Sequence, residues 1–244
     1  MNQQTLDKMK RMKLYGMHRS FQNVLEASTM NNLTTDELLA QLIESEWDDR
    51  HNRAVARTLH NAKFRYKASI EMIDYSIERG LDINHINRLA DCSFIKQQQN
   101  LIITGSTGTG KSFLASAIGN QACLTGYKVL YANAARLFSQ IKVAKADGTS
   151  LQEYARIEKV DLLILDDFGI QPLDSQSRMI LMEIIEDRHS KKSTLIAGQV
   201  PVSAWYEIIG DETLADAILD RVVHDAHKVE LKGESLRKKR KIEQ

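Results

Sequence analysis

The spacing of apolar residues changes character near residue 100 of the chain. Before that point apolar side chains recur at helical intervals, as in the series Leu6, Met9, Met12. After it, runs of three or four apolar residues alternate with longer amphipathic stretches. This change predicts a helical N-terminal region followed by a region in which strands alternate with helices.

The clearest N-terminal helix is predicted within residues 34–50. Thr35 is expected to cap it, and Asp36 and Glu37 fall in the first turn, where the helix dipole favours anions. A further helix is predicted over about 48–59. The apolar face of the first helix consists of Leu38, Leu39, Leu42, Ile43 and Trp47.

The second region has the pattern of a parallel sheet covered on both faces, because its strands are apolar throughout. Strands are predicted at 100–105, 128–133, 161–167 and 193–198, and helices at 111–124, 134–146, 175–190 and 213–221. The segment between about 78 and 100, interrupted by Gly80, is interpreted as a connector. We therefore predict an α/β domain over 79–244, preceded by a small all-helical domain over 1–78.

Composition narrows the class of protein only slightly. With 244 residues, 43% hydrophobic and 27% charged, the chain has room for one small and one larger globular domain. A net charge of +1 gives no sign of nucleic acid binding at the level of the whole chain. A charged N-terminus without an apolar core, and no run of 18 apolar residues, predict a cytoplasmic protein without a membrane partner. Cys92 and Cys123 lack metal-ligand spacing and are expected to be isolated thiols.

A glycine-rich loop between a predicted strand and a predicted helix carries the first chemical signal. The loop fits G-x-x-x-x-G-K-[ST], in which backbone N–H groups surround phosphates, the lysine reaches the β- and γ-phosphates, and the hydroxyl helps to hold Mg²⁺. The alternative is a mobile Gly/Thr turn with a solvated lysine, which the strand and helix around it disfavour. The candidate ATP-binding residues are Gly105, Ser106, Thr107, Gly108, Thr109, Gly110, Lys111 and Ser112.

A second signal is the pair of carboxylates that ends the apolar run at 161–167. Asp166 lies 55 residues after Lys111 and is expected to hold Mg²⁺ with Ser112. Asp167 is expected to orient and activate the water that attacks ATP. The alternative, a solvated Asp-Asp turn, becomes weak once the phosphate loop is present.

Together these motifs resemble the AAA+ ATPases, and within them the DnaC/IstB-like branch of helicase loaders and insertion-sequence helper ATPases. Most AAA+ proteins carry Asp-Glu where this chain has Asp166-Asp167, so the shorter second carboxylate implies slow intrinsic hydrolysis. The sequence GESLRKKRK after LADAILDR is close to that of the insertion-sequence helpers. Looser matches occur at LYGM, near Tyr15, and over residues 64–75.

The resemblance implies three further site residues. Gln199, after the fourth predicted strand, would sense the γ-phosphate or the attacking water, although it could instead bond its own loop. Arg221 would enter the site of a neighbouring subunit, or else pair with Asp220 or Asp225 on its own surface. Arg237 would act as a second sensor in its own subunit, or be one solvated charge of the basic C-terminal run.

Basic residues suggest where DNA would bind. The stretch 50–67 has six cations and no carboxylate, with Phe64 and Tyr66 between the last three; the acidic residues of the preceding helix could neutralise it instead. Initiator-like AAA+ proteins also use the segment after the second strand, which here offers Arg136, Lys142 and Lys145, although these could simply be solvated. Contacts to phosphate make binding sequence-independent and salt-dependent. The six cations are Arg50, Arg53, Arg57, Lys63, Arg65 and Lys67.

The function implied by the resemblance is an ATP-dependent helper that assembles on duplex target DNA as a homo-oligomeric ring or spiral and regulates a cognate transposase. One alternative is a DnaC-like loader of a replicative helicase. Another is a P-loop small-molecule kinase, which lacks a recognisable set of lid arginines here and leaves the basic stretch unexplained. A third is a DNA-binding scaffold with a degenerate ATP site.

Overall fold

A computed structural model describes residues 2–27 and 33–236 of the chain. These residues form two compact units, Met1–Arg57 and Thr58–Gln244. The division falls earlier than the expected one after residue 78, because residues 58–78 pack on the second unit: Ala62, Ala68 and Ile73 are buried in its core. Among the described residues, no helix combines the length and the apolar character needed to cross a membrane.

The first unit consists of α1 (Asn2–Arg11), α2 (Tyr15–Glu26) and most of α3 (Thr35–Ala62). Helix α3 is continuous, whereas two helices were expected over the same residues. Its N-cap is Thr34 rather than Thr35. The Glu37 amide donates to the Thr34 hydroxyl at 3.3 Å and the Glu37 carboxylate accepts from the Thr34 amide at 2.8 Å, which is a reciprocal capping box.

The predicted apolar face of α3 is only partly used within this unit. Leu42 is buried with Leu6 and Phe21, and Leu38 packs against this cluster. Leu39, Ile43 and Trp47 instead leave half or more of their surface exposed. The sequence pattern therefore identified the helix correctly but not which of its apolar residues enter the core.

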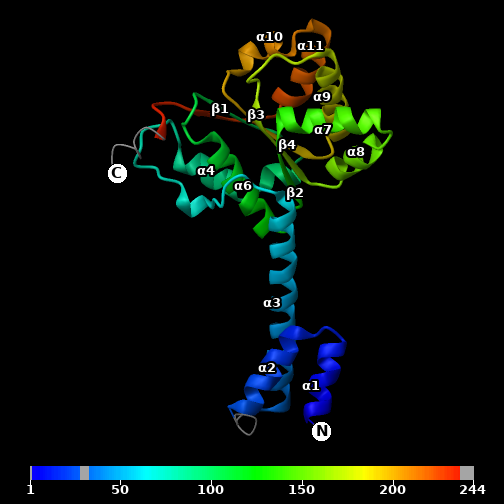
Figure 1. The fold of residues 1–244 in the computed structure, drawn as a ribbon. Helices are drawn as coiled ribbons and strands as arrows, with labels where there is room; N and C mark the ends of the chain where they lie inside the picture. The colour runs from blue at the N-terminus through cyan, green and yellow to red at the C-terminus, as the bar shows by residue number, and fades with distance from the viewer. Residues whose placement is uncertain (1, 28–32, 237–244) are drawn as a thin grey trace. The chain divides into compact units, whose positions relative to one another are not determined.

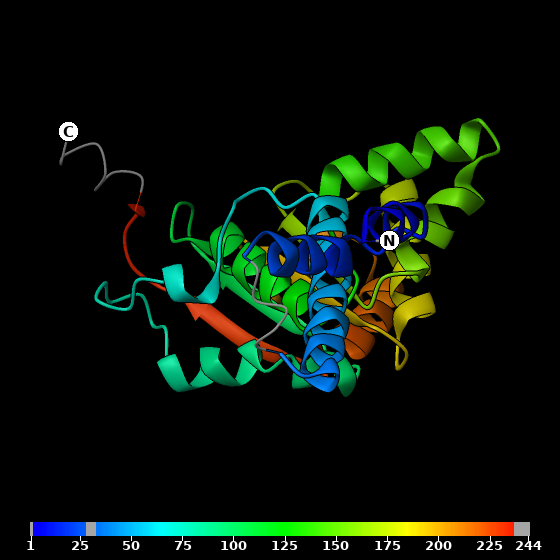
Figure 2. The same cartoon turned by 90° about the horizontal axis from the view of Figure 1, so that it is seen from below.

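A parallel five-stranded sheet forms the centre of the second unit, in the order β2-β3-β4-β1-β5. The edge strand β5 is the orange-red arrow in Figure 2. The strands of the sheet are β1 (Leu101–Gly105), β2 (Val129–Asn133), β3 (Leu162–Phe168), β4 (Ser193–Gly198) and β5 (His227–Leu231). The first four confirm the prediction. The fifth was missed because it is an edge strand with only Val229 and Leu231 buried, so it lacks a continuous apolar run.

Helices cover both faces of this sheet (Figure 1). The first face packs against α4 (Ile83–Ala90), α5 (Ser93–Lys96), the 3₁₀ turn η2 (Ile70–Met72) and α6 (Lys111–Leu124). The second face packs against α7 (Ala134–Ala146), α8 (Ser150–Glu158), α9 (Ser175–Arg188), η3 (Val202–Ala204), α10 (Trp205–Ile209) and α11 (Glu212–Val223). Alternate strand residues enter opposite cores, which explains the uninterrupted apolar runs in the sequence. The expected connector before β1 contains two helices, α4 and α5.

Both cysteines lie in the first of these cores as buried free thiols, as the sequence predicted. Burial raises the pKa of Cys123 to about 12, so this thiol stays protonated at neutral pH.

Arg188, the last residue of α9, is a charged side chain that is only 2% exposed. It forms hydrogen bonds to several segments around the second core. Its guanidinium donates to the carbonyls of Ile157 at 2.9 Å and Ser193 at 2.6 Å, and to the Thr194 hydroxyl at 3.1 Å. Burial lowers the pKa of Arg188 to about 10, which still leaves it charged at neutral pH. This one side chain therefore connects the end of α8, the end of α9 and the start of β4.

Candidate nucleotide site

Strand order determines where the candidate residues meet. β4 lies between β3 and β1, and all strands are parallel. The loops that leave the carboxyl ends of these three strands therefore emerge side by side, the usual position of a ligand site in an open α/β sheet. They carry the glycine-rich loop, the Asp166-Asp167 pair and Gln199.

The glycine-rich loop has a backbone that only glycine adopts readily. Gly105, Gly108 and Gly110 have φ angles of 147°, 87° and 100°. A Cβ atom on Gly105 would stand 2.2 Å from the Leu231 carbonyl oxygen, and one on Gly108 would stand 2.0 Å from the Ser235 hydroxyl. Two of the glycines are therefore needed for space as well as for conformation.

Lys111 begins α6 directly after this loop and is 8% exposed. Its Nζ atom donates to the Ser106 carbonyl at 2.8 Å, and the Thr109 hydroxyl donates to the same oxygen at 2.9 Å. The ammonium thus lies over the loop, and Ser112 follows in the first turn of α6. The N–H groups of that turn lack carbonyl partners within the helix, which makes this end of α6 suited to phosphate.

Asp166 is 1% exposed at the end of β3. One carboxylate oxygen accepts from the Tyr131 hydroxyl; burial and this hydrogen bond raise the pKa of Tyr131, so the phenol remains a donor. The other oxygen, Oδ1, is buried without a hydrogen-bond partner among the described residues. A buried carboxylate oxygen without a donor requires a cation or a water molecule, so this residue fits the expected magnesium ligand.

Asp167 has a left-handed backbone, with φ at 59°, at the point where the pairing of β3 with β4 becomes irregular. This turn directs its carboxylate to two donors from other elements. Asn133 Nδ2 lies 3.0 Å from Oδ2, and Arg65 Nη1 lies 2.9 Å from the same atom. Arg65 also lies 3.6 Å from an oxygen of Asp166. No sequence pattern indicated that Asn133 and Tyr131 belong to the site, and for Arg65 the sequence analysis predicted only a DNA contact.

Gln199 lies beside the glycine-rich loop. The Thr107 hydroxyl donates to its Oε1 atom at 2.8 Å, so the amide contacts the candidate phosphate loop. Gly198 precedes it where a Cβ atom would stand 2.9 Å from the Phe168 carbonyl oxygen. This close approach of two strands explains why the residue before Gln199 has no side chain.

Arg79, which the sequence analysis did not identify, also contacts the glycine-rich loop. It is 7% exposed, and its guanidinium donates to the Thr109 carbonyl at 3.3 Å and to the Asp74 carbonyl at 2.6 Å. Desolvation lowers the pKa of Arg79. The Leu236 amide also donates to the Gly108 carbonyl at 3.0 Å, so segments from both ends of this unit hold the loop.

The two candidate arginines from the C-terminal region differ in what the structure describes. Arg221 lies on α11, where its Nε atom is 2.7 Å from a carboxylate oxygen of Glu186 on α9. Its partner within the chain is therefore neither Asp220 nor Asp225. Arg237 lies outside the described residues.

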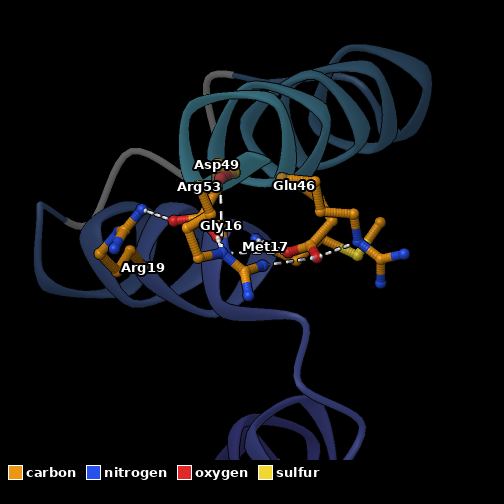
Figure 3. A network of polar contacts seen from close by, with 7 residues as sticks. Gly16, Met17, Arg19, Glu46, Asp49 and Arg53 are labelled. Atoms are coloured by element: carbon orange, nitrogen blue, oxygen red, sulfur yellow. Dashed lines mark hydrogen bonds and ion pairs between the residues drawn. The ribbon is translucent and has the colours of Figure 1, made fainter. Parts of the chain in front are cut away.

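Within the first unit, Arg50 and Arg53 pair with carboxylates of their own helix. Figure 3 shows Arg53 beside Asp49. Arg50 Nε lies 2.7 Å from Glu46, and Arg53 Nε lies 2.6 Å from Asp49. Although burial acts to raise it, the pKa of Glu46 is lowered by Arg50 and by backbone amides of α2. The guanidinium groups nevertheless remain half exposed, and Arg57 is exposed one turn further on.

The remaining candidate DNA-binding residues lie on the second unit. After α3 the chain alternates, so Lys63, Arg65 and Lys67 are exposed while Phe64 and Tyr66 pack against the core. The two aromatic side chains are therefore structural here. The lysines of α7 pair with carboxylates of the α9 region: Lys142 with Asp174 at 2.5 Å and Lys145 with Glu183 at 2.9 Å.

Comparison with known proteins agrees with this geometry. The family described as IstB-like ATP binding protein matches residues 7–244. The insertion-sequence ATP-binding protein y4pL of Sinorhizobium fredii is 46% identical over 238 residues, which cover 96% of each chain.

Among solved structures, the DnaC helicase loader aligns with a TM-score of 0.54 at 18% identity, over 68% of this chain and 98% of that one. The replication initiator DnaA, bound to AMPPCP and single-stranded DNA, aligns with a TM-score of 0.58 at 21% identity, over 70% of this chain and 52% of that one. The sheet with its glycine-rich loop is thus an AAA+ P-loop fold, and the chain belongs to the IstB-like family of ATP-binding proteins.

Proposed function

We propose that this chain is an ATP-dependent transposition helper that assembles on duplex target DNA and regulates its cognate transposase through ATP binding and hydrolysis. The observation that carries the proposal is the meeting of the glycine-rich loop, the Asp166-Asp167 pair and Gln199 at one edge of the sheet. Membership of a family whose relatives are ATP-binding proteins of insertion sequences supports the transposition role.

The nucleotide is bound by the loop and the start of α6. Amides of residues 105–112 and the Lys111 ammonium hold the β- and γ-phosphates. Ser112 and Asp166 would hold Mg²⁺, in keeping with the buried Oδ1 atom of Asp166, which has no hydrogen-bond partner among the described residues. Bound there, Mg²⁺ would neutralise phosphate charge.

Hydrolysis depends on residues that contact the γ-phosphate or the attacking water. Asp167 orients that water and accepts its proton, and Gln199 positions the γ-phosphate from the adjacent strand. In the present arrangement the Asp167 carboxylate is engaged by Arg65 and Asn133. The intrinsic rate is therefore low until this contact is released.

Subunits share the site, which makes the active form a ring or spiral in the cytoplasm. Arg221 leaves Glu186 and stabilises the charge that develops on the γ-phosphate of a neighbouring subunit. Its guanidinium is partly exposed and its partner more so, with side-chain exposures of 27% and 54%, so the pair is open to exchange. Arg237 is proposed as the second sensor within the same subunit.

A mixing experiment tests the shared site. Arg221→Ala and Asp167→Asn subunits are each expected to be nearly inactive in ATP hydrolysis. Mixed in equal amounts they restore part of the activity, because some interfaces then combine an intact Asp167 with an intact Arg221. A mixture as inactive as its components would show that Arg221 does not act across subunits.

A further inference from the structure

A basic pocket adjoins Asp167 on the second unit. Its volume is about 420 Å³, and Asp167 is the only carboxylate among the residues that line it. Four cations from three separate stretches of chain line the same pocket: Lys63, Arg65, Arg136 and Arg156. An excess of cations around one hollow is electrostatically unfavourable unless an anion binds there.

Local structure brings these cations together. Lys63 follows α3 in a left-handed conformation, with φ at 58°, and the alternation after it turns Arg65 outward. Arg136 lies in the first turn of α7, and Arg156 lies on α8. Within the residues that the structure describes, Lys63 and Arg136 form no ion pair, and Arg156 has only Glu153 at 3.5 Å. The pocket therefore presents charge that the fold leaves largely uncompensated.

Arg65 links this pocket to the nucleotide site. Its guanidinium lies over the Tyr66 ring, 5.7 Å from the centroid, and pairs with Asp167 at 2.9 Å. Its side chain is 44% exposed, which leaves donors directed to the pocket. A guanidinium has five donors in a planar fork and binds phosphate as readily as carboxylate. An anion in the pocket consequently competes with Asp167 for Arg65.

We propose that the pocket binds a phosphate group of the DNA backbone, and that this phosphate draws Arg65 away from Asp167. Asp167 then becomes available to the attacking water, because its Oδ2 atom, which now accepts a hydrogen bond from Arg65 at 2.9 Å, loses that donor. Arg65 is a positioning residue in this scheme: it couples DNA binding to ATP hydrolysis. The inference rests on the proposed function and adds to it a phosphate site and the means by which DNA accelerates turnover.

The test compares ATP turnover with and without duplex DNA in four proteins: the unaltered chain, Arg65→Gln, Arg65→Lys and the double variant Arg136→Gln/Arg156→Gln. We expect duplex to stimulate the unaltered chain. Arg65→Gln turns over faster without DNA and gains little from it, an increase that a merely damaged fold would not produce. Arg65→Lys keeps the charge but not the fork, and retains part of the stimulation. The double variant loses two phosphate contacts and is expected to need roughly tenfold more DNA for half-maximal stimulation.

Lys96→Gln is the matched control, since Lys96 is an exposed cation of α5 that does not line the pocket. It is expected to follow the unaltered chain at every DNA concentration. Inorganic phosphate distinguishes the source of the ligand: stimulation by duplex at concentrations where free phosphate has no effect supports a backbone phosphate. Stimulation by inorganic phosphate alone would overturn the assignment to DNA.

The outcomes separate this inference from the function on which it rests. Equal DNA stimulation of Arg65→Gln and the unaltered chain would overturn the coupling role but leave the helper function standing. Duplex that binds to the unaltered chain without stimulating ATP turnover would likewise overturn the coupling role and leave the helper function standing. Failure of the unaltered chain to bind duplex in any nucleotide state would overturn both.

Discussion

At the scale of single residues, Lys111 is the side chain on which we propose that nucleotide binding depends most directly. It now lies 2.8 Å from a carbonyl of its own loop, from which it is proposed to turn to the phosphates. Lys111→Ala is expected to lower ATP affinity by about 10- to 100-fold, since a hydrogen bond to a charged group contributes about 1.5–3 kcal/mol. Titration with a fluorescent ATP analogue measures this. Lys96→Ala serves as the control, and an unchanged affinity in Lys111→Ala would remove the phosphate role of the loop.

Asp167 is proposed to determine the rate of ATP hydrolysis and not the affinity for ATP. Asp167→Asn keeps the shape of the side chain but removes its basicity, so ATP should bind normally while hydrolysis slows by about 100-fold or more. Single-turnover hydrolysis, measured beside the binding titration, separates the two effects. Asp174→Asn makes the same chemical change at the exposed N-cap of α9, where Asn caps equally well, and should leave both quantities unchanged. Full turnover in Asp167→Asn would place the water-activating group elsewhere.

The sequence revealed some of these residues and not others, for a physical reason. Gly105–Ser112 and Asp166-Asp167 were recognisable because each motif is contiguous and its chemistry depends on fixed spacing. Tyr131, Asn133 and Arg65 reach the same carboxylates from separate parts of the chain. Nothing in local spacing indicates such a convergence, which depends on strand order and on the path of the chain after α3.

At the scale of elements, the buried Arg188 is the most specific structural requirement. Arg188→Met keeps the bulk of the side chain but leaves several buried carbonyls without donors, including those of Ile157 and Ser193. We expect the free energy of unfolding to fall by about 3 kcal/mol, from one or two unsatisfied buried groups at about 1–3 kcal/mol each. Urea denaturation measures the change. Lys159→Met, at the exposed end of α8, is the control. Equal free energies of unfolding for the two variants would contradict the stabilising role of the Arg188 hydrogen bonds.

The strands differ in how well the pattern of apolar residues predicts them. β1 to β4 were predictable because both faces of each strand are buried, which demands an unbroken apolar run. β5 lies at the edge of the sheet and alternates buried with exposed residues over only five positions, which gives too short a signal. The sequence of α3 contains no glycine or proline between the two helices that were predicted, so nothing ends the first helix and one long helix forms.

At the scale of the whole molecule, the proposed DNA contacts predict a measurable salt dependence. Three arginines of the predicted DNA-binding stretch lie on α3: Arg50, Arg53 and Arg57. Arg57 is the cleanest probe of them because, unlike Arg50 and Arg53, it forms no ion pair among the described residues. Arg57→Gln should weaken duplex binding equally for all sequences and reduce the slope of log K against log salt by about 0.9, the value for one lost phosphate contact. Binding titrations at several salt concentrations give the slope. Lys159→Gln should leave it unchanged, and an unchanged slope in Arg57→Gln would remove this residue from the DNA surface.

The most direct test of the central claim is the anisotropy of labelled duplex and single-stranded DNA titrated with the full chain in ATP, in ADP and without nucleotide. The helper function predicts tight, cooperative binding of duplex in the ATP state alone, with weak binding of single strands. A preference for single strands would contradict it and indicate a helicase loader. Indifference to DNA in all three nucleotide states would contradict every DNA-dependent function and favour a search for small phosphate acceptors.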